Sequence, residues 1–238
     1  MPSLSDVGLN FPKPVVKGIF FERENRFAAN VLVKNQAVRA HVPSSGRMEE
    51  LLVPGAVCYL TEIKGRERKT DFKLFAVGFK GGIVSIDSLI PNKLVHVALK
   101  QKVIPELADY DQIVPESVFG ESRIDFLIMN DSSRCLVEVK SVTLSEGRVG
   151  LFPDAPSERG QKHLKELINA REKGLDAGVV FVVQREDADF FSPNYQQDPV
   201  FSSLLKEAFI SGVKIIIFTC TVSQDRIEFC KRIPVVFY

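Results

Sequence analysis

The sequence predicts two domains: a small OB-like β-barrel at the amino terminus, followed in sequence by an α/β domain with a mixed sheet. The predicted fold is therefore α+β overall. Two observations lead to this prediction. Residues 11–86 contain five short apolar segments separated by turn residues, which is typical of a small barrel. From about residue 87 onward, helical patterns alternate with apolar strands, which is typical of a mixed sheet covered by helices. We place the domains at residues 1–86 and 87–238.

The strands expected in the first domain are rich in valine, leucine, phenylalanine and alanine. Asparagine, proline and glycine separate them, because these residues favour turns. Five strands in about 75 residues fit a Greek-key OB barrel, and a small SH3-like barrel would give the same pattern. The five segments are residues 15–21, 27–33, 37–42, 56–60 and 72–77.

The second domain opens with a helix expected from Pro91 to Tyr110, whose apolar residues recur at helical spacing. Pro91 suits the first turn of this helix, whereas Pro105 should kink or end it. A hairpin follows. Residues 122–129 and 135–142 are predicted strands because they are short and aliphatic, and a turn-prone polar segment joins them.

Two helices and two buried strands complete the second domain. Ser157 is expected to cap a helix that Gly174 stops. Residues 177–183 and 213–220 are almost continuously apolar, as in strands buried on both faces. Between these strands, residues 199–210 form an amphipathic helix.

Three charged side chains on the predicted hairpin are the most informative feature of the chain. Side chains alternate across a strand, so Glu138 and Lys140 point to one face while their valine neighbours point to the other. Asp125 occupies a polar position in the preceding apolar strand. Charges in such strands lose hydration, which costs several kcal/mol per ion unless a partner or a metal compensates. Asp…Glu-x-Lys is the pattern of metal-dependent nucleases, although a solvated edge strand can carry the same charges.

Composition excludes several classes of protein. No apolar run approaches the ~20 residues that span a bilayer, and the first residues lack the basic and apolar regions of a signal peptide. The four cysteines have no Cys-x-x-Cys spacing, so we expect small buried side chains in a reducing cytoplasm. There are three histidines and no two are close, so any metal should be a hard cation held by carboxylates, Mg²⁺ or Mn²⁺.

The net charge of +1 hides an asymmetry between the two domains. Residues 1–86 carry 13 Lys and Arg against 8 Asp and Glu, a net of +5, and the remainder has a net of −4. A basic domain beside a carboxylate-bearing one suits a polyanion such as nucleic acid. Arg66, Arg68 and Lys69 fall in an expected loop, where they could contact phosphates or simply form a solvated hairpin tip.

Four sequence blocks carry a resemblance to a known family. The four blocks are Ser122-Arg123-Ile124-Asp125-Phe126, Glu138-Val139-Lys140-Ser141-Val142-Thr143-Leu144, Phe152-Pro153-Asp154-Ala155 and Arg159-Gly160-Gln161-Lys162-His163-Leu164. In this order and spacing they resemble the sugar fermentation stimulation protein A family, and a hairpin flanked by helices resembles the core of the PD-(D/E)xK nuclease superfamily. The amino-terminal part is similar too, through Asn25-Arg26-Phe27 and residues 41–46, although the family more often has Asn-Thr where this chain has Ser44-Ser45.

The resemblance covers nearly the whole chain and implies a function. Members of the family are described as DNA-binding proteins with little sequence preference that are proposed to regulate sugar metabolism. They pair an OB-like domain with a nuclease-like domain. The resemblance therefore implies nonspecific DNA binding with a nuclease-type metal site. The alternatives are an active Mg²⁺-dependent DNA phosphodiesterase and an RNA-processing factor.

If the site is catalytic, the roles of its side chains can be assigned. Asp125 and Glu138 would bind one or two divalent ions, and Lys140 would orient the attacking water or neutralise charge on the phosphate. Glu106 or Glu116, which precede the hairpin, could complete the metal shell.

Nucleic-acid contacts are expected beside the hairpin and in the first turn of the next helix, where backbone N–H groups favour a phosphate. His163 on that helix is expected to be a packing histidine rather than a general base. The expected contacts are Arg123, Arg159, Gln161 and Lys162.

Overall fold

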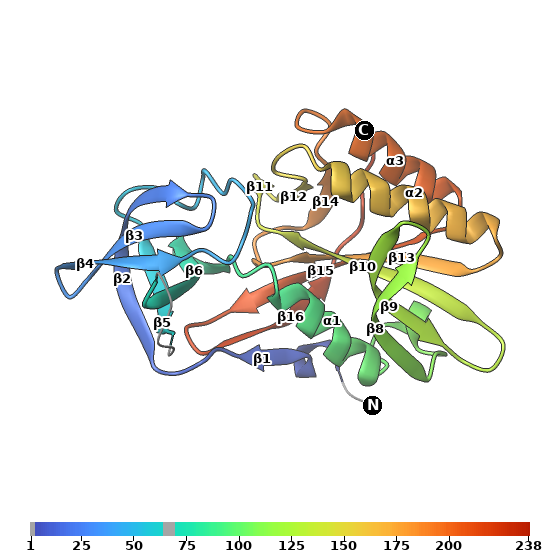
Figure 1. The fold of residues 1–238 in the computed structure, drawn as a ribbon, viewed down its shortest axis with the longest axis horizontal. Coiled ribbons are helices and arrows are strands. Elements are labelled where there is room, and N and C mark those ends of the chain that lie inside the picture. The colour runs from blue at the N-terminus through green and yellow to red at the C-terminus, as the bar shows by residue number, and fades with distance from the viewer. Residues whose placement is uncertain (1–2, 64–69) are drawn as a thin grey trace.

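The structure, a computed structural model, describes residues 3–63 and 70–238 of the chain. A small β-domain lies beside a larger domain in which helices cover a sheet (Figure 1). The predicted nucleic-acid contacts Arg66, Arg68 and Lys69 lie outside the described residues.

The amino-terminal domain contains the OB barrel predicted from the sequence. Its strands follow the order β4-β3-β2-β5-β6-β7, and β4 also pairs with β6 in parallel, which closes the barrel. Alternate side chains such as Phe20, Val31 and Leu60 point inward and are buried in its core. The strands are β2 (Val15–Asn25), β3 (Ala28–Val33), β4 (Gln36–His41), β5 (Val57–Glu62), β6 (Phe72–Phe79) and β7 (Gly82–Ser85).

The second domain is built on a seven-stranded mixed sheet with the order β1-β16-β15-β13-β10-β9-β8. The central strands β10, β13 and β15 run parallel, while the outer pairs are antiparallel. A small sheet of three strands lies beside it. The bounds are β1 (Gly8–Asn10), β8 (Gln112–Phe119), β9 (Ser122–Met129), β10 (Arg134–Val142), β13 (Asp176–Val183), β15 (Lys214–Val222) and β16 (Arg226–Arg232), then β11 (Ser145–Glu146), β12 (Val149–Phe152) and β14 (Phe190–Pro193).

The amino-terminal segment differs from the predicted division of the chain. A 3-10 turn (Leu4–Asp6) and strand β1 pack on β16, where Gly8 pairs with Glu228. Val7 is buried in the core of the second domain. Residues 4–10 therefore belong structurally to the larger sheet, although they precede the barrel in sequence.

In the described part of the chain, three helices cover the two faces of the large sheet. Helix α1 (Ile90–Lys100) packs on one face, and α2 (Glu158–Glu172) and α3 (Pro199–Ile210) pack together on the other. Helix α1 is shorter than the predicted helix because Lys102 takes a positive φ of 55° and Pro105 begins a separate 3-10 turn (Pro105–Leu107). The predicted cap of α2 is confirmed, since Ser157 Oγ accepts a hydrogen bond of 3.1 Å from Gly160 N.

The helices and the cysteines bear on the membrane spans and disulfides that were considered from composition. Over residues 3–63 and 70–238, none of the helices has the length and apolar character that a membrane span requires. The four cysteines are free thiols: Cys58, Cys135 and Cys220 are buried and Cys230 is exposed. Burial raises the pKa of the Cys58 and Cys135 thiols to about 12, so these side chains behave as small apolar groups.

Candidate metal site and nucleic-acid cleft

The hairpin of β9 and β10 places the two carboxylates on two adjacent inner strands of the large sheet. Its turn is fixed by Asn130 Oδ1, which accepts hydrogen bonds from Ser132 N and Ser133 N at 3.0 and 2.8 Å. The register pairs Val137 with Phe126, so the next residues along the two strands carry the acidic side chains. Glu138 is buried, whereas Asp125 is half-buried.

Glu138 is a buried carboxylate with only one of its two oxygens satisfied. Its exposed fraction is 3%, and Lys140 Nζ donates to Oε1 at 2.6 Å. His163, which α2 carries onto this face, also contacts Oε1 through Nδ1. Glu138 Oε2 is buried and has no hydrogen-bond partner among the residues that the structure describes. An unpaired carboxylate oxygen in a buried position is costly, so this atom indicates a site for a cation.

Asp125 supplies the second carboxylate and is held in a defined orientation. Asn92 Nδ2, on helix α1, donates to Oδ1 at 2.7 Å. The backbone N–H of Val139 donates to Oδ2 at 2.8 Å. Helix α1 and strand β10 thus hold the carboxylate beside Glu138.

The surroundings shift the two carboxyl groups in opposite directions. Burial raises the pKa of Asp125, and the negative charge of Glu138 raises it further. Burial alone would also raise the pKa of Glu138, but Lys140 and His163 outweigh it and hold that pKa below its ordinary value. The two groups repel each other when both are ionised, and a divalent cation between them would remove that repulsion.

Asp125, Glu138 and Lys140 line a cleft of about 710 Å³ between the two domains. One wall belongs to the barrel and includes Arg26 and the loop 44–46. The opposite wall includes the segment 152–157, and the start of α2 contributes Arg159. The predicted catalytic side chains therefore lie in a cleft that both domains build.

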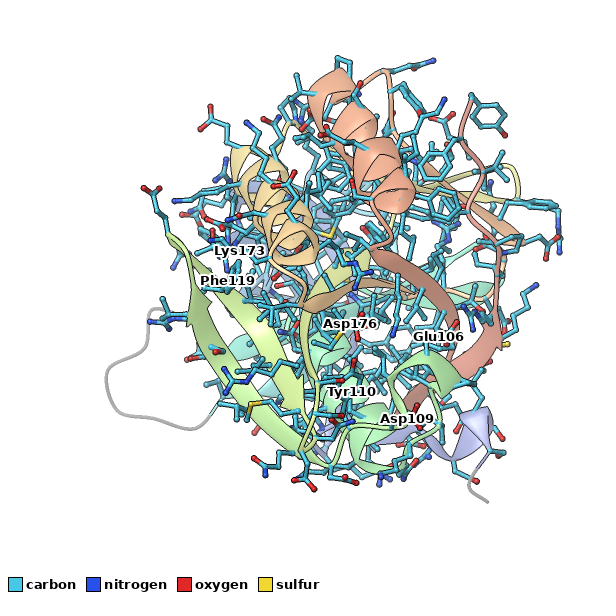
Figure 2. All side chains as sticks on the ribbon, turned by 90° about the vertical axis from the view of Figure 1, so that its right-hand side faces the viewer. Glu106, Asp109, Tyr110, Phe119, Lys173 and Asp176 are labelled. Atoms are coloured by element: carbon cyan, nitrogen blue, oxygen red, sulfur yellow. The ribbon has the colours of Figure 1, made fainter. Side chains whose placement is uncertain are left out.

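The structure treats the two candidate third carboxylates differently. Glu106, which is labelled in Figure 2, forms an ion pair with Arg232, and its backbone carbonyl accepts a hydrogen bond of 2.9 Å from Lys214 Nζ. It is not among the residues that line the cleft. Glu116 does line the cleft, where it pairs with Arg123 at 3.3 Å. Of the two alternatives, the geometry favours Glu116.

The predicted contacts on α2 point to different sides of the helix. Arg159 is exposed and lines the cleft. Gln161 Nε2 instead donates to both oxygens of Asp198, at 3.0 and 3.1 Å, and so ties α2 to the start of α3. Lys162 pairs with Glu121 at 3.1 Å on the surface. Of these three side chains only Arg159 lies at the cleft, because a helix turns by about 100° per residue.

Four residues at the site were missed from the sequence. His163 contacts Glu138, and its only sequence signal was a place on the buried face of the helix, next to Leu164. Asn92 and Lys93 lie on helix α1 and had no signal. Arg26 lies in the barrel, 96 residues before Ser122 at the start of the hairpin, so only the tertiary arrangement brings it to the cleft.

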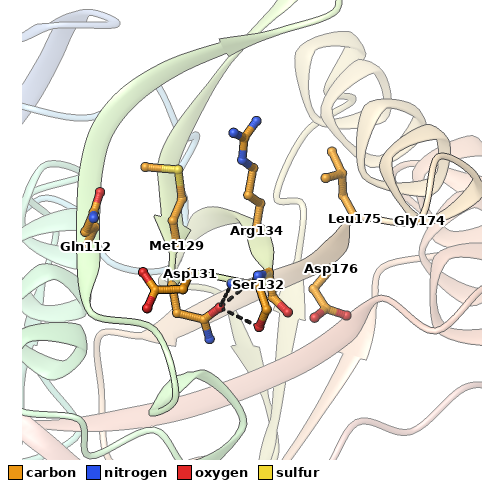
Figure 3. Close-up of a pocket in the computed structure, with 10 residues that line it drawn as sticks. Gln112, Met129, Asp131, Ser132, Arg134, Gly174, Leu175 and Asp176 are labelled. Carbon is orange, nitrogen blue, oxygen red and sulfur yellow. Dashed lines mark hydrogen bonds between the residues drawn. The ribbon is translucent and has the colours of Figure 1, made fainter.

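A second cavity, of about 610 Å³, lies at the other end of β10, where β10 and β13 begin (Figure 3). Arg134 and Asp176 line it. Tyr110 Oη donates to Asp176 at 2.6 Å, and Arg171 donates to the same carboxylate, so the charge of Asp176 is already compensated (Figure 2). This cavity contains none of the predicted site residues.

The donor set at the cleft fits one hard divalent cation. In the part of the chain that the structure describes, no group of three or more His, Cys, Asp and Glu side chains is arranged as a metal site. Asp125 and Glu138 nevertheless present two carboxylates, one with an open oxygen. Mg²⁺ is commonly held by one or two carboxylates and keeps water or phosphate at its other positions. The residues can therefore hold Mg²⁺ or Mn²⁺.

Comparisons with known proteins agree with the two-domain architecture. The model of the SfsA N-terminal OB domain matches residues 21–86, and the model of the Sugar fermentation stimulation protein RE domain matches residues 89–226. A Sugar fermentation stimulation protein homolog from Desulforamulus reducens is 43% identical over 231 residues, which are 97% of this chain and 96% of that protein.

Two further relatives extend the likeness. A homolog from Caldanaerobacter subterraneus subsp. tengcongensis is 43% identical over 94% of this chain and 97% of its own length. The solved structure of Pyrococcus furiosus SfsA in complex with Ca²⁺ is 33% identical, superposes with a TM-score of 0.87, and the match covers 94% of this chain and 97% of that chain.

Proposed function

The chain belongs to the sugar fermentation stimulation protein family, and from its site we propose a DNA-binding protein that carries a divalent-metal site of the nuclease type. One observation carries the proposal. Among the residues that the structure describes, Glu138 Oε2 is a buried carboxylate oxygen without a hydrogen-bond partner, in the same cleft as Asp125 and Lys140. Glu106 Oε2 is also buried without such a partner, but Glu106 pairs with Arg232 and does not line the cleft. The presence of a second carboxylate, Asp125, in the cleft of Glu138 therefore favours a metal site over a structural ion network.

Asp125 and Glu138 would hold the ion, and Glu116 and Asp154 are the other carboxylates that line the same cleft. When bound, Mg²⁺ or Mn²⁺ would polarise a phosphodiester and lower the pKa of a coordinated water. The Ca²⁺ in the complex of the Pyrococcus furiosus relative supports a hard divalent cation here, because Ca²⁺ and Mg²⁺ both prefer oxygen ligands.

Lys140 acts on the phosphate and the water rather than on the metal. Its ammonium lies 2.6 Å from Glu138 Oε1 and is largely shielded from solvent. From this position it would orient the attacking water or stabilise charge that develops on the phosphate oxygens. Its charge would be most effective in the transition state, where negative charge has accumulated.

Binding to DNA would be dominated by phosphate contacts. The cleft is lined by the exposed cations Arg26, Lys93 and Arg159, and residues 1–86, which include Arg26, have a net charge of +5. Such contacts attract the backbone of any sequence, so little sequence preference is expected. The free cysteines are typical of a protein in a reducing compartment, so the proposed location of the protein is the cytoplasm.

A regulatory protein without cleavage is the second candidate, and one contact favours it. Lys140 and His163 already occupy Glu138 Oε1, so the cluster could be a structural ion network. In that case the protein would regulate through DNA binding without cleavage, which agrees with the role in sugar fermentation that the family name states. An RNA-processing role is a further alternative, because OB folds accept single strands of DNA or RNA.

Calorimetric titration with Mg²⁺ and Mn²⁺, alongside cleavage assays on DNA and RNA, tests the proposal. The parent protein should bind the ion, and Asp125→Ala and Glu138→Ala should abolish both binding and cleavage. Glu121→Ala is the matched control, because it removes an exposed carboxylate outside the cleft and should change neither. A parent protein that binds no divalent ion would refute the metal site. Metal binding without cleavage of DNA or RNA would support the regulatory role.

A further inference from the structure

Arg185, which follows strand β13, connects the large domain to the barrel. It is 2% exposed, and its Nη1 donates to Glu50 Oε1 of the barrel at 2.7 Å. Its Nε and Nη2 donate to the two oxygens of Asp187, at 2.6 and 2.7 Å, within the large domain. The guanidinium carbon lies 4.9 Å from the ring centre of Phe79, on barrel strand β6. Arg185 is therefore held by both domains at once.

Gln184, the residue before Arg185, makes a second connection and is fully buried. Ser85 Oγ, on barrel strand β7, donates to Gln184 Oε1 at 2.7 Å. Gln184 Nε2 in turn donates to Ser141 Oγ at 2.9 Å, and Ser141 is the residue after Lys140 on β10. A chain of hydrogen bonds thus runs from the barrel to the residue beside Lys140.

Both connections end on the segment 141–145, which continues strand β10. Arg185 Nη1 also donates to the carbonyl oxygen of Thr143 at 3.0 Å, and Glu50 Oε1 accepts a hydrogen bond of 3.4 Å from Ser145 N. All of this segment except Ser145 lines the cleft, whereas Glu50 and Arg185 do not line it. The two connections therefore lie behind the cleft and tie its wall to the barrel.

Apolar packing also joins the domains, but it does not by itself fix their orientation. The ring of Phe75 on barrel strand β6 lies 4.3 Å from the ring of Phe11, and both are buried in a core of the large domain. Burial of apolar surface is non-directional, whereas a guanidinium and a buried amide accept partners only in defined positions. A rotation of the barrel would leave the buried polar groups of Arg185 and Gln184 without partners, which is costly.

We propose that Arg185 and Gln184 are positioning residues that set the separation of the two walls of the cleft, and with it the affinity for DNA. The barrel wall carries the exposed Arg26, and the opposite wall carries the exposed Arg159. One phosphate backbone can contact both cations only at a suitable separation of the walls, so a barrel free to rotate would lose the contact of Arg26. The effect on DNA rests on the proposed function, whereas the orientation of the domains does not depend on it.

The first experiment measures binding of a labelled DNA duplex by fluorescence anisotropy in EDTA, at several salt concentrations. In the parent, Arg26→Ala should flatten the slope of log affinity against log salt by about 0.9, the value for one phosphate contact on duplex DNA. In a Glu50→Ala background, Arg26→Ala should have no further effect, because Arg26 no longer reaches the phosphate. An equal effect of Arg26→Ala in both backgrounds would overturn the proposal, since a loss of stability alone leaves that contact intact.

Glu24→Ala is the matched control for Glu50→Ala, because Glu24 is a barrel glutamate that pairs with an arginine, Arg39, at 2.6 Å outside the cleft. Both variants remove one negative charge, which alone would leave DNA affinity level or raise it slightly. Glu50→Ala should nevertheless weaken binding, whereas Glu24→Ala should not. An equal loss of affinity in the two variants would contradict the proposal. Arg185 keeps Asp187 as its partner in Glu50→Ala, and thermal unfolding checks that the variants are folded.

The second experiment follows the orientation of the domains without DNA, as the distance between two spin labels measured by pulsed electron paramagnetic resonance. The labels are placed at Gln36→Cys on β4 and Lys165→Cys on α2, both exposed, and Cys230→Ser removes the exposed native thiol. The parent should give one narrow distance distribution, and both Glu50→Ala and Ser85→Ala should give a broader or shifted one. If both variants keep the distribution of the parent, the positioning role is wrong.

The two experiments separate this inference from the proposed function. A parent that binds no DNA, but whose domains change their orientation in Glu50→Ala, would support the positioning role and refute DNA binding. A parent that binds DNA, with domains that keep their orientation in Glu50→Ala and Ser85→Ala, would refute the positioning role alone. Glu50→Ala should bind Mn²⁺ in calorimetry as the parent does, because Glu50 does not line the cleft. Loss of Mn²⁺ binding would show that Glu50 acts on the metal site instead, and would overturn the inference.

Discussion

Replacing Lys140 by methionine tests the central ion pair, because methionine keeps much of the apolar stem and removes the charge. Lys140 Nζ donates to Glu138 Oε1 at 2.6 Å, and both residues are buried. Within residues 3–63 and 70–238, the variant leaves Glu138 with His163 as its only side-chain partner on that oxygen and with no partner on Oε2. Breaking a buried pair by removing one member costs about 3–5 kcal/mol, since the remaining charge stays buried without compensation.

The expected loss is large enough to measure by thermal unfolding. For a chain of 238 residues, 1 kcal/mol shifts Tm by about 2–4 °C, so Lys140→Met should melt about 6–20 °C below the parent in EDTA. Mn²⁺ should recover part of this loss, because the ion supplies positive charge to Glu138. At 100 times its Kd, an ion that binds only the folded state adds about 2.7 kcal/mol. Metal binding should persist in this variant, whereas cleavage should be suppressed.

A double-mutant cycle isolates the pair. Glu138→Gln in the Lys140→Met background removes the uncompensated charge, so the double variant should be more stable than Lys140→Met alone. It should also lose the stabilisation by Mn²⁺, because a ligand carboxylate is gone. If Lys140→Met melts together with the parent in EDTA, the buried ion pair does not contribute as reasoned here. If Mn²⁺ stabilises the double variant as much as the parent, Glu138 is not a metal ligand.

Three further outcomes are expected. Neutralising Arg66, Arg68 and Lys69 together should weaken binding equally across duplex sequences and flatten the salt slope by about 2.7, and an unchanged slope in anisotropy titrations would mean that this segment does not touch phosphate. Burial and the charge of Glu138 raise the pKa of Asp125, so its ionised form is disfavoured in the folded state. Without metal, the free energy of unfolding should therefore decrease as the pH rises from the ordinary aspartate pKa to the raised pKa of Asp125. Asp125→Asn should be more stable than the parent at neutral pH in EDTA and lose that advantage in acid, and Mn²⁺ affinity of the parent should begin to fall at a higher pH than an ordinary aspartate would give. Ser157→Ala removes the acceptor of Gly160 N and should cost about 1 kcal/mol in urea unfolding, whereas Ser157→Asp should keep the cap.

Local features of the chain could be predicted from the sequence because local chemistry determines them. The hairpin with Asp125, Glu138 and Lys140 follows from strand alternation and a polar turn, both of which act over a few residues. The cap at Ser157 follows from the unpaired N–H groups at the start of any helix. Such preferences operate wherever the segment lies, so they could be recognised without knowledge of the remaining fold.

Only the tertiary structure decided which distant segments meet at the site. Glu106 and Glu116 are both acidic residues before the hairpin, yet in the folded chain Glu106 forms an ion pair with Arg232 whereas Glu116 lines the cleft. His163 reaches Glu138 because α2 packs across β10, and Arg26 reaches the cleft because the barrel lies against the large sheet. The physical reason is that contacts between distant segments form when complete faces of the sheet, helices and barrel are buried against one another. A short stretch of sequence does not contain the information on how those faces pack.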